Sequence, residues 1–291
     1  MLIIFISLAA LLFGMITDFK IREVPDWLSF SCIFAGVGIA IINSIISGSW
    51  SFIINSLAGL ALGVALGFLM YYTGQWGGGD SKLLMGLGAL LGLKVYGFNL
   101  SEIFDSFLIS FLINILLVGA VYGIVWIFIL GIKNRKKLAK RFKEIRNSRE
   151  FTRLRWVFFF LLIAIILMML FLPNNPLKYY SIGIILLGFI LSYLWLFIKA
   201  VEDLAMIKKI DVSKLTEGDW IYKDVKINGK KICGPKDLGI TKEQIKKLLE
   251  LKKKKKIKEV LIKEGIPFIP SFFTGFILTI FYGNLLFLWL L

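Results

Sequence analysis

Apolar residues fall in long blocks along this chain, separated by polar interruptions. Most blocks hold about 17 to 25 residues, the length that an α-helix needs to cross the hydrocarbon core of a bilayer. The pattern predicts an all-α polytopic membrane protein of about eight transmembrane helices, near residues 1–17, 27–47, 51–72, 83–98, 106–130, 156–172, 179–198 and 267–291.

Two of these blocks depart from the usual pattern. The first has no basic segment before it and no small-residue cleavage site after it, so we expect it to remain as a span and not to be removed as a secretory signal. The fourth block, near 83–98, is short, which predicts a tilted or partly re-entrant helix.

The interruption at 199–266 is long enough to fold in water. Residues 219–235 alternate between apolar and polar across Asn228-Gly229, a dipeptide that favours a tight hairpin turn. Thr241 stands three residues before Gln244, the spacing of a capping box at a helix start. These features predict a small α+β cytoplasmic domain.

The blocks also suggest how the chain is divided. We expect a membrane core that carries the candidate site, a basic cytoplasmic connection, two further transmembrane helices, the small cytoplasmic domain and a C-terminal transmembrane helix. Their respective bounds are 1–130, 131–155, 156–198, 199–266 and 267–291.

The positive charge lies almost entirely on one side of the expected membrane. Of the 35 lysine and arginine residues, 33 occur in the interruptions at 18–26, 73–82, 131–155 and 199–266. Basic loops remain in the cytoplasm, so this placement predicts cytoplasmic basic segments and both termini outside. Topology thus explains the formal net charge of +16, and we expect a lipid bilayer, not nucleic acid, as the partner of these segments.

Composition removes several kinds of chemistry. The chain has no histidine, which excludes a Ser-His-Asp triad, an HExxH zinc site and histidine-ligated haem. Its two cysteines, Cys32 and Cys233, are too few and too far apart for a four-cysteine zinc site, so we expect two free thiols. No metal, no cofactor and no particular oligomeric state is predicted.

Two acidic residues stand at the expected cytoplasmic ends of apolar blocks. A carboxylate at membrane level is energetically costly, so each one calls for a structural or functional explanation. Asp18 ends the first block, and Asp80 follows Gly77-Gly78-Gly79 before the fourth. Each has a structural alternative: Asp18 could pair with Lys20 or Arg22, and Asp80 could cap a helix. The glycines could form a hinge, or could let a peptide approach and aim the carboxylate at it.

The pair is more informative than either acid alone. Two carboxyl groups within hydrogen-bonding reach, partly shielded from water, share one proton because they cannot both ionise easily. The ionised member can take a proton from water while the protonated member polarises a peptide carbonyl. Without histidine, this is the least demanding hydrolytic chemistry available to the chain.

The motif Gly77-Gly78-Gly79-Asp80, with Asp18 upstream and followed by Val24-Pro25-Asp26, resembles the prepilin peptidase family. More narrowly, it resembles the archaeal preflagellin and prepilin peptidases, which are GxGD membrane aspartic proteases. The segment 265–270, with its Pro-Phe-Ile-Pro run, resembles the family signature before the last span, although a plain helix-starting role also fits its prolines.

This resemblance implies that Asp18 and Asp80 are the catalytic pair and that the glycine loop presents Asp80. It also implies a substrate: a type IV pilin-like or archaellin precursor whose short basic leader is cut at the cytoplasmic face. The chain lacks the paired CxxC segment of many bacterial relatives, so no N-methyltransferase activity is expected.

Two other functions use the same acids. A presenilin or signal-peptide-peptidase type of protease also carries GxGD, but its Tyr-Asp and Pro-Ala-Leu motifs do not occur in this sequence. An ion-coupled transporter could use Asp18 and Asp80 as proton carriers, but it would place them near the bilayer midplane, and the chain shows no internal repeat.

Overall fold

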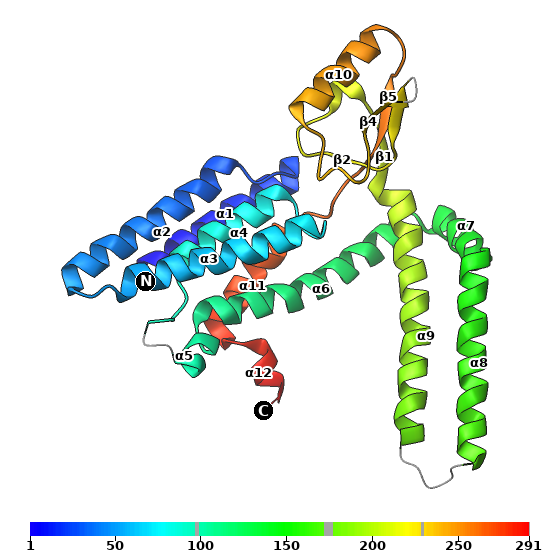
Figure 1. The fold of residues 1–291 in the computed structure, drawn as a ribbon, viewed down its shortest axis with the longest axis horizontal. Coiled ribbons are helices and arrows are strands. Elements are labelled where there is room, and N and C mark those ends of the chain that lie inside the picture. The colour runs from blue at the N-terminus through cyan, green and yellow to red at the C-terminus, as the bar shows by residue number, and fades with distance from the viewer. Residues whose placement is uncertain (97–98, 172–176, 228–229, 291) are drawn as a thin grey trace. The chain divides into compact units, whose positions relative to one another are not determined.

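The computed structural model describes residues 1–96, 99–171, 177–227 and 230–290 (Figure 1). Each of the eight apolar blocks forms helix. The helices in these blocks are α1 (Leu2–Ile21), α2 (Asp26–Ser47), α3 (Ser51–Tyr72), α4 (Gly78–Leu91), α6 (Phe107–Lys133), α8 (Arg149–Phe171), α9 (Leu177–Val201), α11 (Ile269–Tyr282) and α12 (Leu285–Leu290). A five-residue helix, α5 (Leu100–Phe104), precedes α6.

The prediction of a helical membrane protein is confirmed, but the expected eight spans are not reproduced. Within the described residues, five helical segments are long and apolar enough to cross a membrane: Leu2–Ile21, Asp26–Ser47, Ser51–Tyr72, Phe107–Lys133 and Tyr180–Met206. The helices α4 and α11 have 14 residues each. That length gives about 21 Å, less than the ~30 Å of a hydrocarbon core.

The fourth helix is displaced from its expected position at 83–98. It begins earlier, at Gly78, and ends at Leu91, because Gly92 adopts a positive φ of 67°. The chain after it bonds to α3 instead: the Leu93 amide donates to the carbonyl of Asn55, and the Val95 amide donates to the Asn55 side chain. The acid at position 80 therefore lies in the first helical turn.

The last expected span, 267–291, is two helices and not one. The break between α11 and α12 falls at Gly283, whose φ is 66°. Asn114 of α6 is fully buried there: its amide donates to the Gly283 carbonyl at 2.7 Å, and its oxygen accepts from the Leu285 amide at 3.0 Å. This side chain replaces the hydrogen bonds that a continuous helix would have made.

Small residues hold α3 and α4 close together. Gly59, Gly63 and Gly67 are buried at successive turns of α3. A Cβ atom built at Gly59 would lie 2.2 Å from the carbonyl oxygen of Gly88, so only glycine permits this approach. Such spacing is typical of membrane helices that pack backbone to backbone, and it fixes α4 against α3.

The expected small α+β region is present after α9. Its strands are β1 (Ile207–Asp211), β2 (Trp220–Ile221), β3 (Val225–Ile227), β4 (Lys230–Cys233) and β5 (Glu259–Lys263), and its helix is α10 (Lys242–Lys253). One sheet has the order β1-β5-β2, and β3 pairs antiparallel with β4. The turn expected at Asn228-Gly229 lies outside the described residues. A short 3₁₀ turn, Val212–Lys214, follows β1.

Two sequence predictions in this region are confirmed. The Thr241 hydroxyl accepts from the Gln244 amide, and the Gln244 side chain accepts from the Thr241 amide, which completes the capping box of α10. Cys233 is a free thiol, buried with Ile221, Leu248 and Val260 in the core of this region, and Cys32 is also free and buried.

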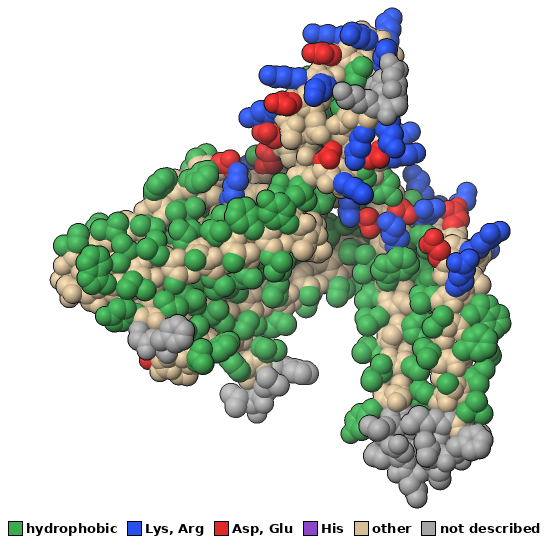
Figure 2. All heavy atoms as spheres, in the orientation of Figure 1, with side chains coloured by type: hydrophobic (Ala, Val, Ile, Leu, Met, Phe, Trp, Pro, Cys, Tyr) green, Lys and Arg blue, Asp and Glu red, His purple; other side chains and the backbone are tan. Residues whose placement is uncertain are grey.

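The chain forms two compact units. The first comprises residues 1–124 and 209–291, and the second comprises residues 125–208. The second unit contains the end of α6, α7 (Arg135–Arg146), α8, α9 and a π-helical turn at Glu202–Met206. Figure 2 shows hydrophobic side chains along the membrane helices, whereas Lys and Arg gather over the α+β region of one unit and near α7 in the other.

Candidate active site

The first candidate acid, Asp18, lies in the last turn of α1 and is only 5% exposed. Its Oδ2 atom accepts a hydrogen bond of 3.0 Å from the backbone amide of Ile269. Ile269 is the first residue of α11, so the carboxylate sits at the amino end of a helix, where backbone amides favour a negative group.

The segment 267–270 therefore does more than start a helix. Its backbone binds Asp18 across 251 positions of sequence, which the resemblance to a Pro-Phe-x-Pro signature did not reveal. Pro270 is in the first turn of α11, where its missing amide is tolerated and the other free amides remain available to the carboxylate.

The second candidate acid, Asp80, lies in the first turn of α4 and is partly exposed. Its Oδ2 atom accepts from the Gly77 amide at 3.2 Å, while the Gly77 carbonyl accepts from the Ser81 amide at 3.1 Å. Asp80 therefore closes its own helix start in the way that a capping-box acid does. The capping alternative is observed, and it fixes the direction of the carboxylate.

The three glycines before Asp80 have different surroundings. A Cβ atom at Gly79 would lie 3.0 Å from Cβ and 3.1 Å from the backbone nitrogen of Val24, in the loop that follows α1. At Gly78 the nearest atom would be a ring carbon of Tyr71 at 3.7 Å, an ordinary contact. Only the third glycine is thus required for α4 to approach the loop beyond Asp18.

The fold brings Asp18 and Asp80 to the same end of the packed helices. One turn before Asp18, a Cβ atom at Gly14 would meet Leu83 of α4 at 3.3 Å and Ile269 of α11 at 3.5 Å. Leu83 is one turn beyond Asp80. The two carboxyl groups are close enough for their charges to interact.

Aromatic side chains that sequence reasoning missed surround this end of the bundle. Trp76, just before the glycines, is 6% exposed and packs on Phe268 and Phe272, with ring centroids 5.7 and 5.0 Å apart. Tyr122 of α6 lies within electrostatic range of Asp18. In the sequence, the position of Trp76 directly before the glycine motif was the one feature that could have predicted this aromatic cluster.

Three other acids near span ends form local ion pairs. Asp26 pairs with Lys82 at 2.6 Å, and Glu202 and Asp203 each lie 3.6 Å from Lys199. Among the described residues, no group of three or more Cys, Asp or Glu side chains could hold a metal ion.

The apolar helix bundle is that of a helical membrane protein, and two acids lie near one end of it. Residues 4–127, which include both acids, match the sequence model of the Type IV leader peptidase family. The resemblance to the archaeal preflagellin and prepilin peptidase family is thereby confirmed, and three curated proteins support it.

These three relatives are all called preflagellin peptidase. The protein of Methanococcus maripaludis strain C6 is 38% identical over 86 residues, 30% of this chain and 37% of that protein. The protein of Methanocaldococcus jannaschii is 41% identical over 81 residues, 28% and 34% of the two chains. That of Methanococcus voltae is 35% identical over 86 residues, 30% and 36%. The matches thus span little more than a third of each relative.

Proposed function

We propose that this protein is a membrane aspartic endopeptidase that removes the short basic leader from type IV pilin-like or archaellin precursors. The observation that carries the proposal is the meeting of Asp18 and Asp80 at one end of the bundle, inside the part of the chain that matches the leader peptidase family. The names of the relatives support a preflagellin-type substrate.

The proposed reaction uses the two carboxyl groups as base and acid. One carboxylate takes a proton from water, whose oxygen attacks the scissile carbonyl carbon while the protonated partner donates a hydrogen bond to the carbonyl oxygen. The tetrahedral intermediate collapses as the C–N bond breaks, and the acid that took the proton from water passes it to the leaving amine. One proton stays shared between the two acids, so the pair is ready for the next turnover.

The site also suits a substrate whose cut lies just before an apolar helix. Loop charges favour a cytoplasmic position for the ends of α1 and α4 that carry the acids, with both termini outside. A precursor helix could then lie in the bilayer beside the bundle, with its basic leader at the cytoplasmic face.

The test is processing of a tagged pilin precursor by membranes that contain the protein. We expect Asp18→Asn and Asp80→Asn each to slow cleavage about 10²- to 10⁴-fold, the usual contribution of a positioned acid or base. The matched control is Asp105→Asn, because Asp105 is exposed in the loop before α6; it should process at the normal rate. All three variants should be present in the membrane in equal amounts.

Each competing function predicts a different outcome of the same experiment. Full cleavage by either aspartate variant rejects the pair, and loss of proton-coupled uptake in both would favour a transporter. A cut within the apolar helix, located by the mass of the product, would favour a presenilin type of protease. The same mass measurement should show an unmethylated amino terminus, since we expect no N-methyltransferase activity.

A further inference from the structure

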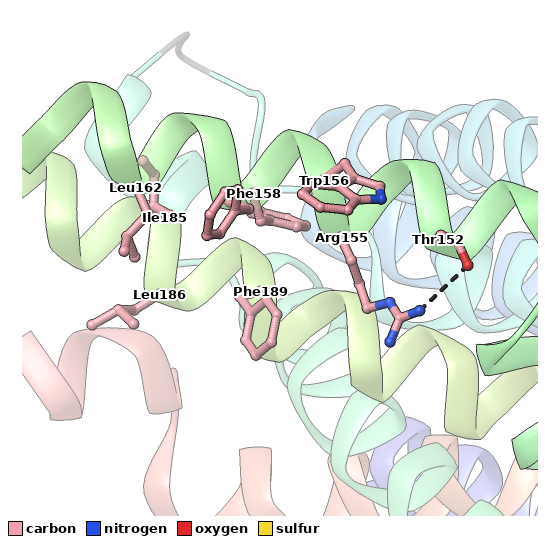
Figure 3. A pocket seen from close by; sticks show the side chains of 9 residues that line it. Thr152, Arg155, Trp156, Phe158, Leu162, Ile185, Leu186 and Phe189 are labelled. Carbon is pink, nitrogen blue, oxygen red and sulfur yellow. Dashed lines mark hydrogen bonds between the residues drawn. The ribbon is translucent and has the colours of Figure 1, made fainter.

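An apolar groove runs between α8 and α9 in the second unit (Figure 3). Its volume is about 670 Å³, and its walls are almost entirely aromatic and aliphatic. Phe158 and Phe189 pack edge to face across it, with ring centroids 5.8 Å apart. This groove plays no part in the two-carboxylate site and is in none of the segments that match the family model.

One end of the groove is polar and charged. Figure 3 shows Arg155 and Thr152 at this end, with the ring nitrogen of Trp156 beside them. The Arg155 Nη2 atom donates to the Thr152 hydroxyl at 3.3 Å, while its Nε atom is buried and has no hydrogen-bond partner among the described residues. A buried guanidinium donor without an acceptor favours an anionic ligand.

The length of the groove along α8 is about the thickness of one leaflet of a bilayer. A second cavity of about 200 Å³ shares Leu162 and Ile185 with the first and extends it to Ile166. Arg155 and Ile166 are 11 positions apart on one helix, which at 1.5 Å per residue is roughly 16 Å. This is about half of the ~30 Å hydrocarbon core, and Trp156 lies at the end where a membrane interface would be expected.

These dimensions distinguish a lipid from a protein segment. A helix with its side chains is about 10–12 Å wide, so the larger cavity would hold less than two of its turns. A volume of this size is instead usual for small-ligand sites. The cationic end excludes the basic leader of a pilin precursor but complements a phosphate group. Arg149 and Arg153, both exposed on α8, add to the positive field there.

We propose that the α8–α9 groove binds one anionic phospholipid. Its phosphate accepts hydrogen bonds from Arg155 and Thr152, and one acyl chain lies along Phe158 and Phe189 toward Leu162 and Ile185. Lipid bound in this way fills the space between α8 and α9. It also neutralises Arg155, which lacks a carboxylate partner among the described residues.

The experiment compares phosphatidylglycerol with phosphatidylcholine, added to the full-length protein in detergent. Native mass spectrometry counts the lipids retained, and the melting temperature is followed as each lipid is titrated. We expect one phosphatidylglycerol per chain and a rise in melting temperature, with phosphatidylcholine bound at least about tenfold more weakly, a difference of 1.4 kcal/mol.

Two pairs of variants separate the proposal from general attraction between lipid and a basic protein. Arg155→Gln should remove the preference for phosphatidylglycerol, whereas Arg153→Gln, on the exposed face of the same helix, should keep it. Ile185→Trp should fill the groove and exclude both lipids, whereas Ile184→Trp should not, since Ile184 is 69% exposed on the outer face of α9.

Equal affinity for the two lipids, or the same affinity in Arg155→Gln and Arg153→Gln, would overturn the proposal. So would unchanged lipid retention in Ile185→Trp. Displacement of bound lipid by a pilin precursor helix at stoichiometric concentration would identify a protein segment as the true occupant and would equally reject it.

Discussion

A single missing Cβ atom at Gly79 determines how closely the loop after α1 can approach Asp80. The neighbouring positions in the GGGD motif do not share this constraint, although the sequence presents three identical residues. The difference is steric: backbone atoms of Val24 oppose Gly79, but only the edge of a tyrosine ring opposes Gly78. The glycines of the motif therefore differ in how tightly they pack, although they are the same residue type.

This contrast can be tested with two alanine substitutions. Gly79→Ala should force α4 away from Val24, lower stability by about 1–3 kcal/mol as overpacking does, and slow precursor processing at least about tenfold. Gly78→Ala is the matched control and should change neither quantity by much. Equal processing by the two variants, measured on the same membranes, would show that the close approach at Gly79 does not matter.

A second residue-scale prediction concerns Cys233 in the α+β region. Burial raises the pKa of the Cys233 thiol to about 11, and the nearby Asp237 carboxylate adds to the effect. At pH 8 only about one such thiol in a thousand is ionised. In a Cys32→Ala background, iodoacetamide should label Cys233 slowly at pH 8, and the rate should rise about tenfold for each unit of pH up to about 11.

Chemical denaturation is the control for this measurement, because the unfolded thiol should regain its ordinary pKa and react at once. The raised pKa of the folded thiol also determines how the stability of the α+β region changes with pH. The unfolded thiol loses its proton near pH 9, before the folded one does, so the α+β region should lose stability as pH rises from about 9 to 11. Fast labelling of the folded protein at pH 8 would contradict the buried position.

At the scale of elements, the sequence placed all eight apolar blocks but not the ends of every helix. Hydropathy reports how much apolar surface a segment contains, and it is insensitive to where backbone hydrogen bonding stops. The end of α4 depends on Gly92 and on Asn55 of another helix. The break before α12 depends on Asn114, 169 positions earlier than Gly283.

The break between α11 and α12 yields a test of that dependence. Asn114→Ala should leave the Gly283 carbonyl and the Leu285 amide without their side-chain partner, at a cost of about 2 kcal/mol. We expect a lower melting temperature in detergent and faster amide exchange in α12. The control is Asn147→Ala, since Asn147 is exposed at the end of α7. Equal melting temperatures of the two variants would show that Asn114 does not stabilise the break between α11 and α12.

At the scale of the whole molecule, the structure separates two kinds of chemistry. The unit of residues 1–124 and 209–291 contains both acids and the helix α11 that binds Asp18. The unit of residues 125–208 contains the groove and the arginine at its end. Peptide cleavage and lipid binding are therefore proposals about different parts of the chain, and each can fail while the other stands.

The sequence by itself determined that the chain is a helical membrane protein, that its positive charge gathers between the apolar blocks, and that two acids stand at the ends of such blocks. These are properties of each segment and its solvent, so local composition is sufficient to predict them. Only the tertiary structure decided which ends meet: that α11 presents its first amide to Asp18, that Gly79 packs on Val24, and that α8 and α9 leave a groove. Those outcomes depend on shape complementarity between distant segments, which no local pattern encodes.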